Sequence, residues 1–349
     1  MSKEVPLKYD LLCLGELLID FVEQNKLHDL TDLYQANAGG APGNVACTSQ
    51  RFGLKTGFIG AVGDDVFGRI LIDTLRSNEV DVRGVQVIPN VMTTLAFVSL
   101  GSEGIREFTF ARKGSADTQL SLNETQNNLI SNTQALHFGT LSLTDEPAKT
   151  ATLEAVRKVA EQGGIVSFDP NVRLNLWHSM SELQEAYRAG LEYANILKIS
   201  DEDFEALEGG LHDDSFLDRL GKLFDENLRL LLLTLGKNGS IAYWRSDGII
   251  HSAHAPTDLT RIPIDTTGAG DIFTGAFLSQ LLAELTQNHR SSETLEKYLE
   301  QVNEVEIYRM LLFANQVASL STERHGGITS IPDIKMFTEA YGQEQSINQ

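Results

Sequence analysis

The 349-residue sequence has little cysteine and no long hydrophobic run. Its two cysteines, Cys13 and Cys47, lie inside apolar segments, so a disulfide-based fold is excluded and both are interpreted as reduced core thiols of a cytoplasmic protein. No stretch approaches the ~18 consecutive apolar residues of a membrane-spanning helix. Residues Met1–Asp10 are charged and include no apolar segment, so we expect no secretory signal.

Positive charge is also scarce. Lys and Arg total 28 against 48 Asp and Glu, which gives a formal net charge of −20. Such a surface repels the phosphates of nucleic acids and anionic membranes, so neither is expected as a partner. An anionic ligand would therefore need a local site built from ordered backbone. None of the eight histidines has metal-ligand spacing, and His137 is interpreted as a core residue.

Short, continuously apolar runs alternate with longer amphipathic segments along most of the chain. This alternation predicts an α/β fold, in which a mostly parallel central sheet is flanked by helices on both faces. The loops at the carboxyl ends of the strands are then the expected place for function. The expected strands are Leu11–Leu14, Phe58–Val62, Ala135–Phe138, Ile165–Phe168, Ile196–Ile199 and Leu228–Leu235, and the expected helices include Phe67–Leu75, Ala148–Ala160, Phe216–Phe224 and Ile272–Leu282.

One region departs from this alternation. The segments Thr93–Leu100 and Ile105–Ala111 flank the turn Gly101–Gly104, which predicts a β-hairpin. Leu17–Val22 and Leu33–Ala38 can add two strands to it. We therefore expect a small second sheet that acts as a lid.

Two polar segments are expected at the surface. Thr286–Gln301 is polar and charged, and we expect an exposed helix or loop there. The tail Tyr341–Gln349 is polar and is expected to fray.

The strongest motif is the segment Asp265–Asp271, which directly precedes an apolar helical pattern. Gly268, Ala269 and Gly270 lack bulk, so the unpaired amides at the start of a helix can approach an anion closely. The Asp271 carboxylate beside them can take the proton of a hydroxyl that attacks a phosphate. The structural alternative is a glycine-rich turn with Asp271 as an ordinary helix cap.

A second glycine motif, Gly39–Ala46, lies near the amino terminus. Gly39 and Gly40 let the backbone approach a ligand, and Asn44 can donate and accept hydrogen bonds to hydroxyls. A strand–helix turn capped by Asn44 is the alternative.

The two motifs together resemble the two signatures of PfkB-type sugar kinases, the ribokinase-like family. Gly63–Gly68 follows the first signature at the expected place, and the resemblance extends from about Asp10 to Pro332. It implies one ribokinase-like kinase domain over residues 1–349 with a three-layer fold. The implied lid covers about 16–40 and 91–115.

The family resemblance also assigns roles around the sugar. Asp271 is the implied base, Gly268, Ala269 and Gly270 bind the moving charge, and Arg173 adds positive charge beside it. Arg112 on the hairpin is the candidate cation for an acid substrate. The implied substrate-binding residues are Asp20, Gly39, Gly40, Asn44, Phe108, Arg112 and Asp271.

For ATP and its metal ions the resemblance points to the later strands. Ser200 and Asp203 occupy the family's Asn-x-x-Glu position, where the shorter Asp203 reaches Mg²⁺ only through water and Glu202 competes with it. Asp169 and Asn171 border the phosphate and metal region. The implied nucleotide-binding residues are Ser200, Thr234, Gly236, Gly239, Gly268, Gly270 and Asn315, the Mg²⁺ ligands are Asp203 and Asp169, and the K⁺ ligands are Asp265, Thr267, Gly326 and Ser330.

The stretch Leu174–Ser179 is similar to fructokinases in particular. The resemblance thus favours an ATP-dependent fructokinase, with 2-keto-3-deoxygluconate kinase as the first alternative. A ribokinase or nucleoside kinase and a catalytically silent sugar-binding relative are further alternatives. A homodimer formed through the lid is expected, because a small two-sided sheet tends to bury its second face against a copy of itself.

Overall fold

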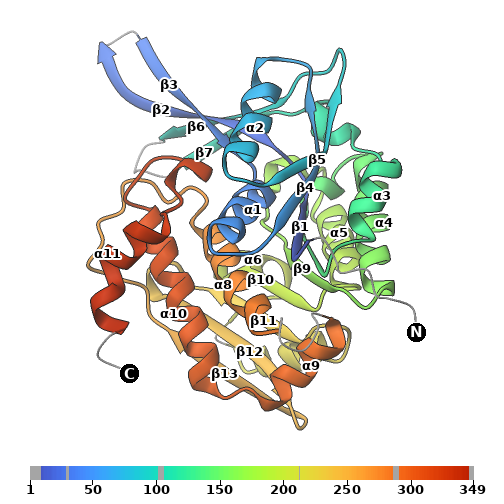
Figure 1. Ribbon diagram of the computed structural model, residues 1–349, viewed down its shortest axis with the longest axis vertical. Helices are drawn as coiled ribbons and strands as arrows, with labels where there is room; N and C mark the ends of the chain where they lie inside the picture. Colours follow the sequence, from blue (N-terminus) through green and yellow to red (C-terminus); the bar gives the residue numbers. More distant parts are fainter. Residues whose placement is uncertain (1–8, 29–30, 101–105, 212, 286–290, 346–349) are drawn as a thin grey trace.

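The computed structural model describes residues 9–28, 31–100, 106–211, 213–285 and 291–345. Its main element is a nine-stranded sheet, which is parallel from β5 to β11 and antiparallel at the β11–β12–β13 edge (Figure 1). All six predicted strands are present. Their order in the sheet is β13 (Ile249–Ala255), β12 (Ser240–Ser246), β11 (Leu230–Thr234), β10 (Ile196–Ser200), β9 (Ile165–Asp169), β8 (Ala135–Gly139), β1 (Leu11–Leu14), β4 (Thr56–Gly63) and β5 (Asp81–Ile88).

Three of these strands, β5, β12 and β13, were absent from the sequence prediction. They lie at the two ends of the sheet and are only partly buried, so they lack the continuous apolar run by which the central strands were recognised. The predicted parallel sheet thus holds for its centre, and the missed strands complete its edges.

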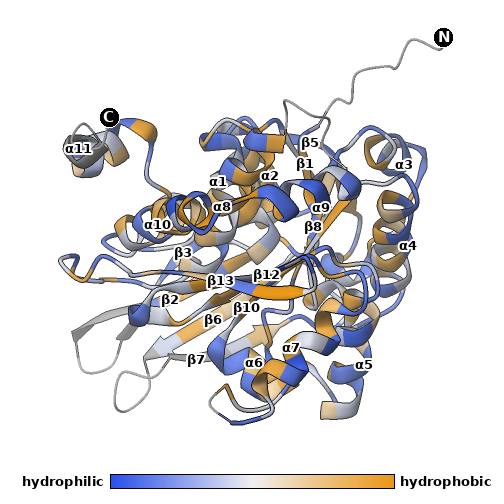
Figure 2. Ribbon diagram, turned by 90° about the horizontal axis from the view of Figure 1, so that it is seen from below, coloured by the Kyte–Doolittle hydropathy of each residue, from blue (hydrophilic) through white to orange (hydrophobic). Residues whose placement is uncertain are grey.

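Helices cover both faces of the sheet, which confirms the three-layer α/β prediction (Figure 2). Side chains alternate along each strand, so Leu11 and Cys13 pack into one core while Leu12 and Leu14 pack into the other. The first core includes α1 (Ala41–Arg51), α2 (Val66–Ser77), α8 (Ala269–Leu285), α9 (Ser292–Gln301), α10 (Glu304–Ser321) and α11 (Ile334–Gln345), and the second α3 (Glu124–Ile130), α4 (Ala148–Glu161), α5 (Met180–Leu191), α6 (Asp201–Leu207) and α7 (Phe216–Phe224).

A separate four-stranded sheet lies beside the first, as the hairpin pattern predicted. Its strand order is β3 (Thr31–Gly39), β2 (Leu18–His28), β6 (Thr94–Leu100) and β7 (Arg106–Ala111). Phe21 on β2 stacks on Phe97 and meets Phe67 of α2 edge-on, so this sheet is packed onto the main body. The turn Gly101–Gly104 lies outside the described residues. The assignment of domain bounds, with a lid over 16–40 and 91–115, stays a prediction.

Two surface predictions were only partly correct. The described part of Thr286–Gln301 contains α9, which buries Leu295 and Leu299 in the core and exposes only its other side. Tyr341 is buried within α11 rather than frayed, because it packs in an aromatic cluster with Phe337. Residues 346–349 lie outside the described part. Within the described residues, no helix combines the length and the apolar character needed to cross a bilayer.

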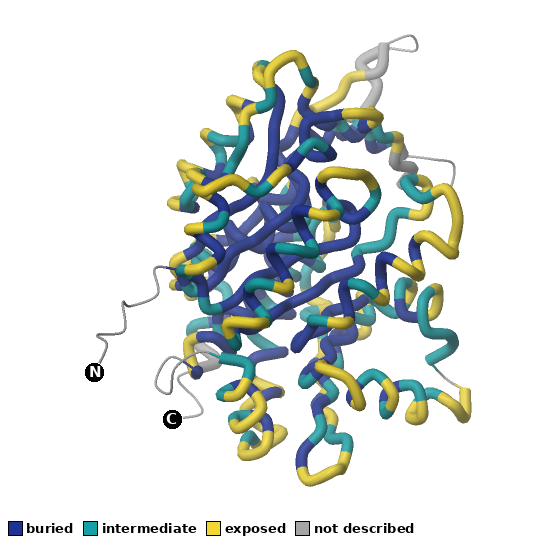
Figure 3. The backbone as a smooth tube through the Cα atoms, turned by 90° about the vertical axis from the view of Figure 1, so that its right-hand side faces the viewer, coloured by how far each residue is buried: buried dark blue, intermediate teal, exposed yellow. Residues whose placement is uncertain are grey.

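The two helices that begin at the glycine motifs, α1 and α8, pack closely against each other. Most residues of both helices are buried, and Figure 3 shows the extent of the buried backbone in the interior of the molecule. Gly275 of α8 forms the contact: an added Cβ would lie 2.7 Å from the Thr48 side chain and 2.8 Å from the Val45 carbonyl oxygen. The Ser49 hydroxyl donates a hydrogen bond to the Gly275 carbonyl oxygen at 3.1 Å. This contact fixes the two glycine motifs relative to each other. Cys13 and Cys47 are unpaired and buried in the same core.

Candidate active site

Two hollows meet at the carboxyl ends of the central strands. The larger, of about 480 Å³, is called here the wide cavity, and it extends from Ser200 and Thr234 to Asn315. The smaller, of about 300 Å³, is called the acidic pocket, because Glu16, Asp20 and Asp271 line it. The described residues that line both hollows are Lys198, Thr266, Ala269 and Gly270.

The start of α8 forms most of this shared wall. Gly268 has φ = +74°, a left-handed conformation that favours glycine, and the chain turns there into the helix. The Ala269 amide donates to the Thr266 carbonyl oxygen at 3.2 Å. The amides that follow it belong to the first turn, where an α-helix offers no internal acceptors and carries its positive dipole end. The predicted anion-binding backbone therefore lies between the two hollows.

Asp271 is the third residue of α8 and lines the acidic pocket. Its Oδ2 accepts a hydrogen bond of 2.7 Å from Asn44 Nδ2, on α1, so a side chain from another element fixes its direction. Burial raises the pKa of Asp271 to about 6, although the Asn44 hydrogen bond opposes the shift. A carboxylate with this pKa can accept a proton near neutral pH.

Asn44 thus holds the carboxylate of Asp271, whereas the sequence assigned it to sugar hydroxyls. Gly40 precedes α1 with φ = +111°, and a Cβ there would meet the Glu16 carbonyl oxygen at 2.4 Å. Asn44 also lines the acidic pocket, while its buried Oδ1 has no hydrogen-bond partner within the described part of the chain. Of the predicted residues in this motif, Gly40 and Asn44 line the pocket, whereas Gly39 does not.

The predicted sugar-binding carboxylate, Asp20 on β2, is buried in the acidic pocket. Burial raises its pKa to about 7, and the nearby Arg173 partly offsets the shift. Gly39 lies so close that an added Cβ would be 2.3 Å from Asp20 Oδ2, which explains the glycine. The sequence assigned no role to Glu16, whose Oε1 accepts the Ala41 amide hydrogen at 3.0 Å and whose pKa burial raises to about 7.

From the lid sheet, Phe110 lines the acidic pocket. The prediction named Phe108, two residues earlier on β7, whose side chain lies outside the described residues. Arg173 lines the pocket as predicted.

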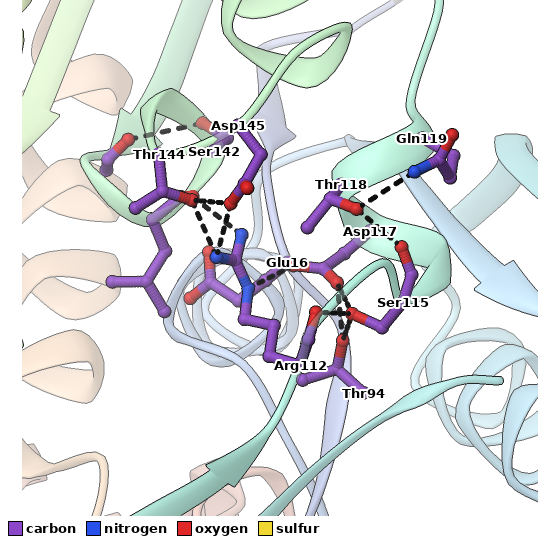
Figure 4. Close-up of polar contacts among 12 residues, drawn as sticks. Glu16, Thr94, Arg112, Ser115, Asp117, Thr118, Gln119, Ser142, Thr144 and Asp145 are labelled. Carbon is purple, nitrogen blue, oxygen red and sulfur yellow. Dashed lines mark hydrogen bonds and ion pairs between the residues drawn. The ribbon is translucent and has the colours of Figure 1, made fainter. Parts of the chain in front are cut away.

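Arg112, predicted to bind substrate, does not line the pocket in this structure. Its Nε donates to Asp117 at 2.7 Å, and its Nη2 donates to the Leu141 carbonyl oxygen at 2.7 Å (Figure 4). Its Nη1 contacts Thr144 at 2.6 Å and Asp145 at 3.4 Å. Because all three guanidinium nitrogens are engaged, Arg112 joins the end of β7 to the main body.

Asp169, a predicted Mg²⁺ ligand, is also engaged by protein atoms. Its Oδ2 lies 3.0 Å from Lys198 Nζ, and its Oδ1 accepts the Asn171 amide hydrogen at 3.1 Å. This arrangement suits an anchor for the ammonium group better than a metal ligand. Sequence reasoning missed Lys198, although a single charge inside the apolar strand Ile196–Ile199 is a usable signal.

The remaining metal candidates lie at the start of α6. The Ser200 hydroxyl caps the helix by accepting the Asp203 amide hydrogen at 3.1 Å. Asp203 Oδ2 accepts from the Val172 amide at 3.2 Å, whereas Glu202 is exposed and lines the wide cavity. No described cluster of three or more His, Cys, Asp or Glu could hold a metal alone. The set fits Mg²⁺ bound by one or two carboxylates, water and phosphate.

Six of the seven predicted nucleotide residues line the wide cavity, whereas Gly268 lines the acidic pocket. Gly236 and Gly239 have φ of +54° and +88°, and an added Cβ at Gly239 would lie 2.1 Å from the Ala255 carbonyl oxygen. Asn315 lines the cavity, but its Nδ2 donates to Ala255 at 2.9 Å and its Oδ1 accepts from Ser240 at 3.1 Å. Asn315 therefore stiffens the wall. Thr234 lines the same wall.

The loop that carries Asp258 lines the wide cavity and is hydrogen-bonded to the last helix, α11 (Ile334–Gln345). Tyr341 on α11 donates a hydrogen bond of 2.7 Å to Asp258 Oδ2, and Arg261 donates to the same oxygen at 3.2 Å. The Arg261 guanidinium also lies over the Tyr341 ring, 5.2 Å from its centre. Asp258 and Arg261 line the cavity, so α11 helps to hold that wall in place.

The residues predicted to bind a monovalent cation come together behind the start of α8. Asp265 accepts the Thr267 amide hydrogen at 2.8 Å and the Gly326 amide hydrogen at 3.0 Å, through separate oxygens. The Ser330 carbonyl oxygen accepts from Arg324 at 2.8 Å. This arrangement joins the loop before α8 to the loop that follows α10.

A helix start between a large cavity and a small acidic pocket is the arrangement expected of an enzyme that transfers a phosphoryl group between two small molecules. Residues 8–334 match the pfkB family carbohydrate kinase, and the chain belongs to that family. The chain is therefore an ATP-dependent carbohydrate kinase, and its fold is the ribokinase-like fold that the sequence predicted.

Individual relatives agree with this assignment. The chain is 37% identical to probable fructokinase-7 of Arabidopsis thaliana over 93% of its own length and 90% of that protein. Its structure is similar to fructokinase with bound ATP from Xylella fastidiosa, at 31% identity and a TM-score of 0.82, covering 96% of this chain and 98% of that one. A Vibrio cholerae fructokinase double mutant, in a form bound to fructose, ADP and potassium ion, gives 27% identity and a TM-score of 0.77, covering 96% and 99%.

Proposed function

We propose that this protein is a fructokinase, which converts ATP and D-fructose to ADP and fructose 6-phosphate. The observation that carries the proposal is the shared wall, where the start of α8 separates a nucleotide-sized cavity from a pocket with three carboxylates. The sugar is the finer part of the proposal, and the names of the relatives support it.

In the proposed reaction fructose occupies the acidic pocket and ATP the wide cavity. Asp20 accepts hydrogen bonds from sugar hydroxyls, and Asp271 takes the proton of the attacking hydroxyl. The amides at Gly268–Gly270 and the Arg173 guanidinium then meet the charge on the phosphoryl group. Asn44 holds Asp271 in the required direction.

Two metal ions belong to the same proposal. Asp203, with Glu202 as the competing candidate, would hold Mg²⁺ together with the ATP phosphates, and bound Mg²⁺ supplies positive charge to them. The residues around Asp265 are proposed to bind K⁺, and the potassium in the Vibrio cholerae relative supports this choice. Omission of each ion in turn from a purified, metal-free preparation measures the two effects separately.

A coupled ADP-release assay tests the sugar assignment. Fructose, 2-keto-3-deoxygluconate, ribose and adenosine are compared at the same ATP concentration, and fructose is expected to give the highest kcat/KM. Absence of saturation with fructose would reject the assignment. Absence of turnover with every sugar would favour the catalytically silent alternative.

The first rival, 2-keto-3-deoxygluconate kinase, needs a cation for the substrate carboxylate. Arg112 was the candidate, and its guanidinium is held by Asp117 and Asp145 away from the pocket lining. This geometry favours the neutral sugar.

We further propose a homodimer through the four-stranded lid sheet. Leu33 and Tyr34 on its edge strand β3 are exposed, and a second copy could cover them. Sedimentation is expected to give twice the chain mass at micromolar concentration, and a strict monomer would contradict the proposal. Location in the cytoplasm stays a prediction from the two unpaired cysteines.

A further inference from the structure

Lys198 occupies the boundary between the two hollows. It lies on β10, and its side chain is 7% exposed. Among the described residues that line both the wide cavity and the acidic pocket, Lys198 is the charged one. A group that passes from one hollow to the other therefore meets its ammonium.

The surroundings of Lys198 suit an anion. A Cβ added to Gly270 would lie 2.9 Å from Lys198 Nζ, so the ammonium sits against the first turn of α8. The helix start and the ammonium are both positive, and two like charges buried together repel each other unless an anion lies between them. The Lys198 ammonium and the first turn of α8 thus both point positive charge at the same place, which favours an anion there.

Nearby carboxylates keep the lysine charged. Burial lowers the pKa of Lys198, but Asp169 and Asp271 more than reverse this effect and raise it above its usual value. Asp169 also fixes the direction of the side chain through the 3.0 Å ion pair. The ammonium is therefore a permanent, oriented charge at neutral pH.

We propose that Lys198 is a catalytic residue whose ammonium contacts the phosphoryl group during its transfer, with Asp169 as its positioning residue. The inference rests on the proposed kinase function. The bond from the γ-phosphorus to the ADP oxygen breaks while the bond from the sugar oxygen to that phosphorus forms. The hydroxyl proton goes to Asp271, and ADP leaves. Lys198 and the α8 amides meet the charge on the phosphoryl oxygens throughout.

The test compares Lys198→Met with Lys198→Arg. Loss of one oriented donor to transition-state charge lowers kcat by about 10²- to 10³-fold in comparable sites, and we expect this for Lys198→Met. Calorimetric affinities for ADP and for the sugar are expected to stay within about threefold, because neither carries the transferring group, and Lys198→Arg recovers part of kcat. Lys158→Met, which removes a remote, ion-paired lysine on α4, is the control and keeps wild-type kinetics.

A buried charge left without its partner can unfold the protein, so Lys198→Met with Asp169→Asn is the second variant. If Lys198→Met does not fold, the double variant takes its place, with the same expected loss. The proposal is overturned if the folded variant keeps kcat within about fivefold of wild type, or if ADP and sugar affinities fall together with kcat. All rates are measured on whichever sugar the wild type prefers. A preference for another sugar then rejects fructokinase and leaves this proposal standing, while a wild type inactive on every sugar overturns both.

Discussion

The acidic pocket and the wide cavity meet at one helix start but are built on different principles. The pocket is lined by three buried carboxylates, Glu16, Asp20 and Asp271, and burial raises the pKa of each one. The cavity lining includes the glycines Gly236, Gly239 and Gly270 and side chains such as Asn315 and Asp258, whose polar atoms bond to the protein itself. We therefore expect the pocket to recognise its ligand mainly through buried carboxylates, and the cavity mainly through the shape of a wall that the protein holds in place.

The largest expected effect tests the chemistry of the pocket. Asp271→Asn keeps the size of the side chain but cannot accept the hydroxyl proton, so we expect kcat to fall by about 10²- to 10⁴-fold. Sugar and ATP affinities, measured by calorimetry, should change little. Asp73→Asn, on the exposed side of α2, is the matched control. Near-normal turnover of Asp271→Asn would remove the assigned base.

The next effect separates binding in the pocket from binding in the cavity. Asp20→Asn removes a charged acceptor of sugar hydroxyls, which is worth about 1.5–3 kcal/mol per hydrogen bond, or roughly 10- to 100-fold in fructose KM. The KM for ATP is expected to stay constant in the same steady-state titration. Equal changes in both KM values would show that the two hollows are not independent.

The pH dependence sharpens the same contrast. Asp271 must be ionised to act as base, and Asp20 must be ionised to act as a charged acceptor of sugar hydroxyls. The value of kcat/KM for the sugar should therefore start to fall below about pH 7 and fall more steeply below about pH 6. Stability should move the other way. The folded pKa values of Glu16 and Asp20, each about 7, lie above their unfolded values, so the folded state binds more protons and unfolding becomes harder as pH falls from about 8 to 5.

Chemical denaturation across this pH range, without sugar, provides the measurement. Asp20→Asn should flatten the rise in stability towards acid, because it removes one of the contributing groups. A stability that falls steadily from pH 8 to 5 would contradict the predicted sign.

The smallest expected effect lies in the cavity. Tyr341→Phe keeps the aromatic packing and removes only the hydrogen bond to Asp258, so we expect ATP KM to rise about three- to tenfold. Fructose KM and kcat should be unchanged, because α11 contacts the wall of the cavity and not the pocket. Tyr308→Phe, on a part-exposed site of α10, is the control. A change confined to kcat would contradict the proposal that Tyr341 holds the cavity loop that carries Asp258.

Parts of both hollows could be predicted from the sequence for a physical reason. Glycines forced by close approach, such as Gly39 beside Asp20, and a glycine-rich helix start leave a local pattern in the sequence. The paired strands β6 and β7 of the four-stranded sheet and the buried central strands are local patterns too, and both sets of strands were predicted correctly.

Partnerships between distant residues leave no such pattern. Arg112 was interpreted as a free cation, although three side chains hold it. Its partner Asp117 is only five residues away, but it follows the end of β7 without a recognisable pattern, and Thr144 and Asp145 follow more than 30 residues later. Lys198 was assigned only as part of an apolar strand. Its partner Asp169 lies on the neighbouring strand β9, and the sequence does not show that the two side chains meet. For both side chains, the three-dimensional arrangement determines whether the charged group is available to a ligand or is bound by other protein atoms. The residue type alone does not determine this.

Because α1 and α8 pack so closely, a substitution at their contact is expected to affect the residues at their amino ends. Any side chain larger than hydrogen at Gly275 acts as a wedge against Thr48 and Val45, and the same two helices carry Asn44 and Asp271 at their amino ends. We expect a wider separation of the two helices to lengthen the hydrogen bond from Asn44 to Asp271, the proposed base, without changing the chemistry of any residue that lines the pocket. Gly275 is therefore the natural starting point in a search for temperature-conditional forms, in which activity is lost on warming and regained on cooling.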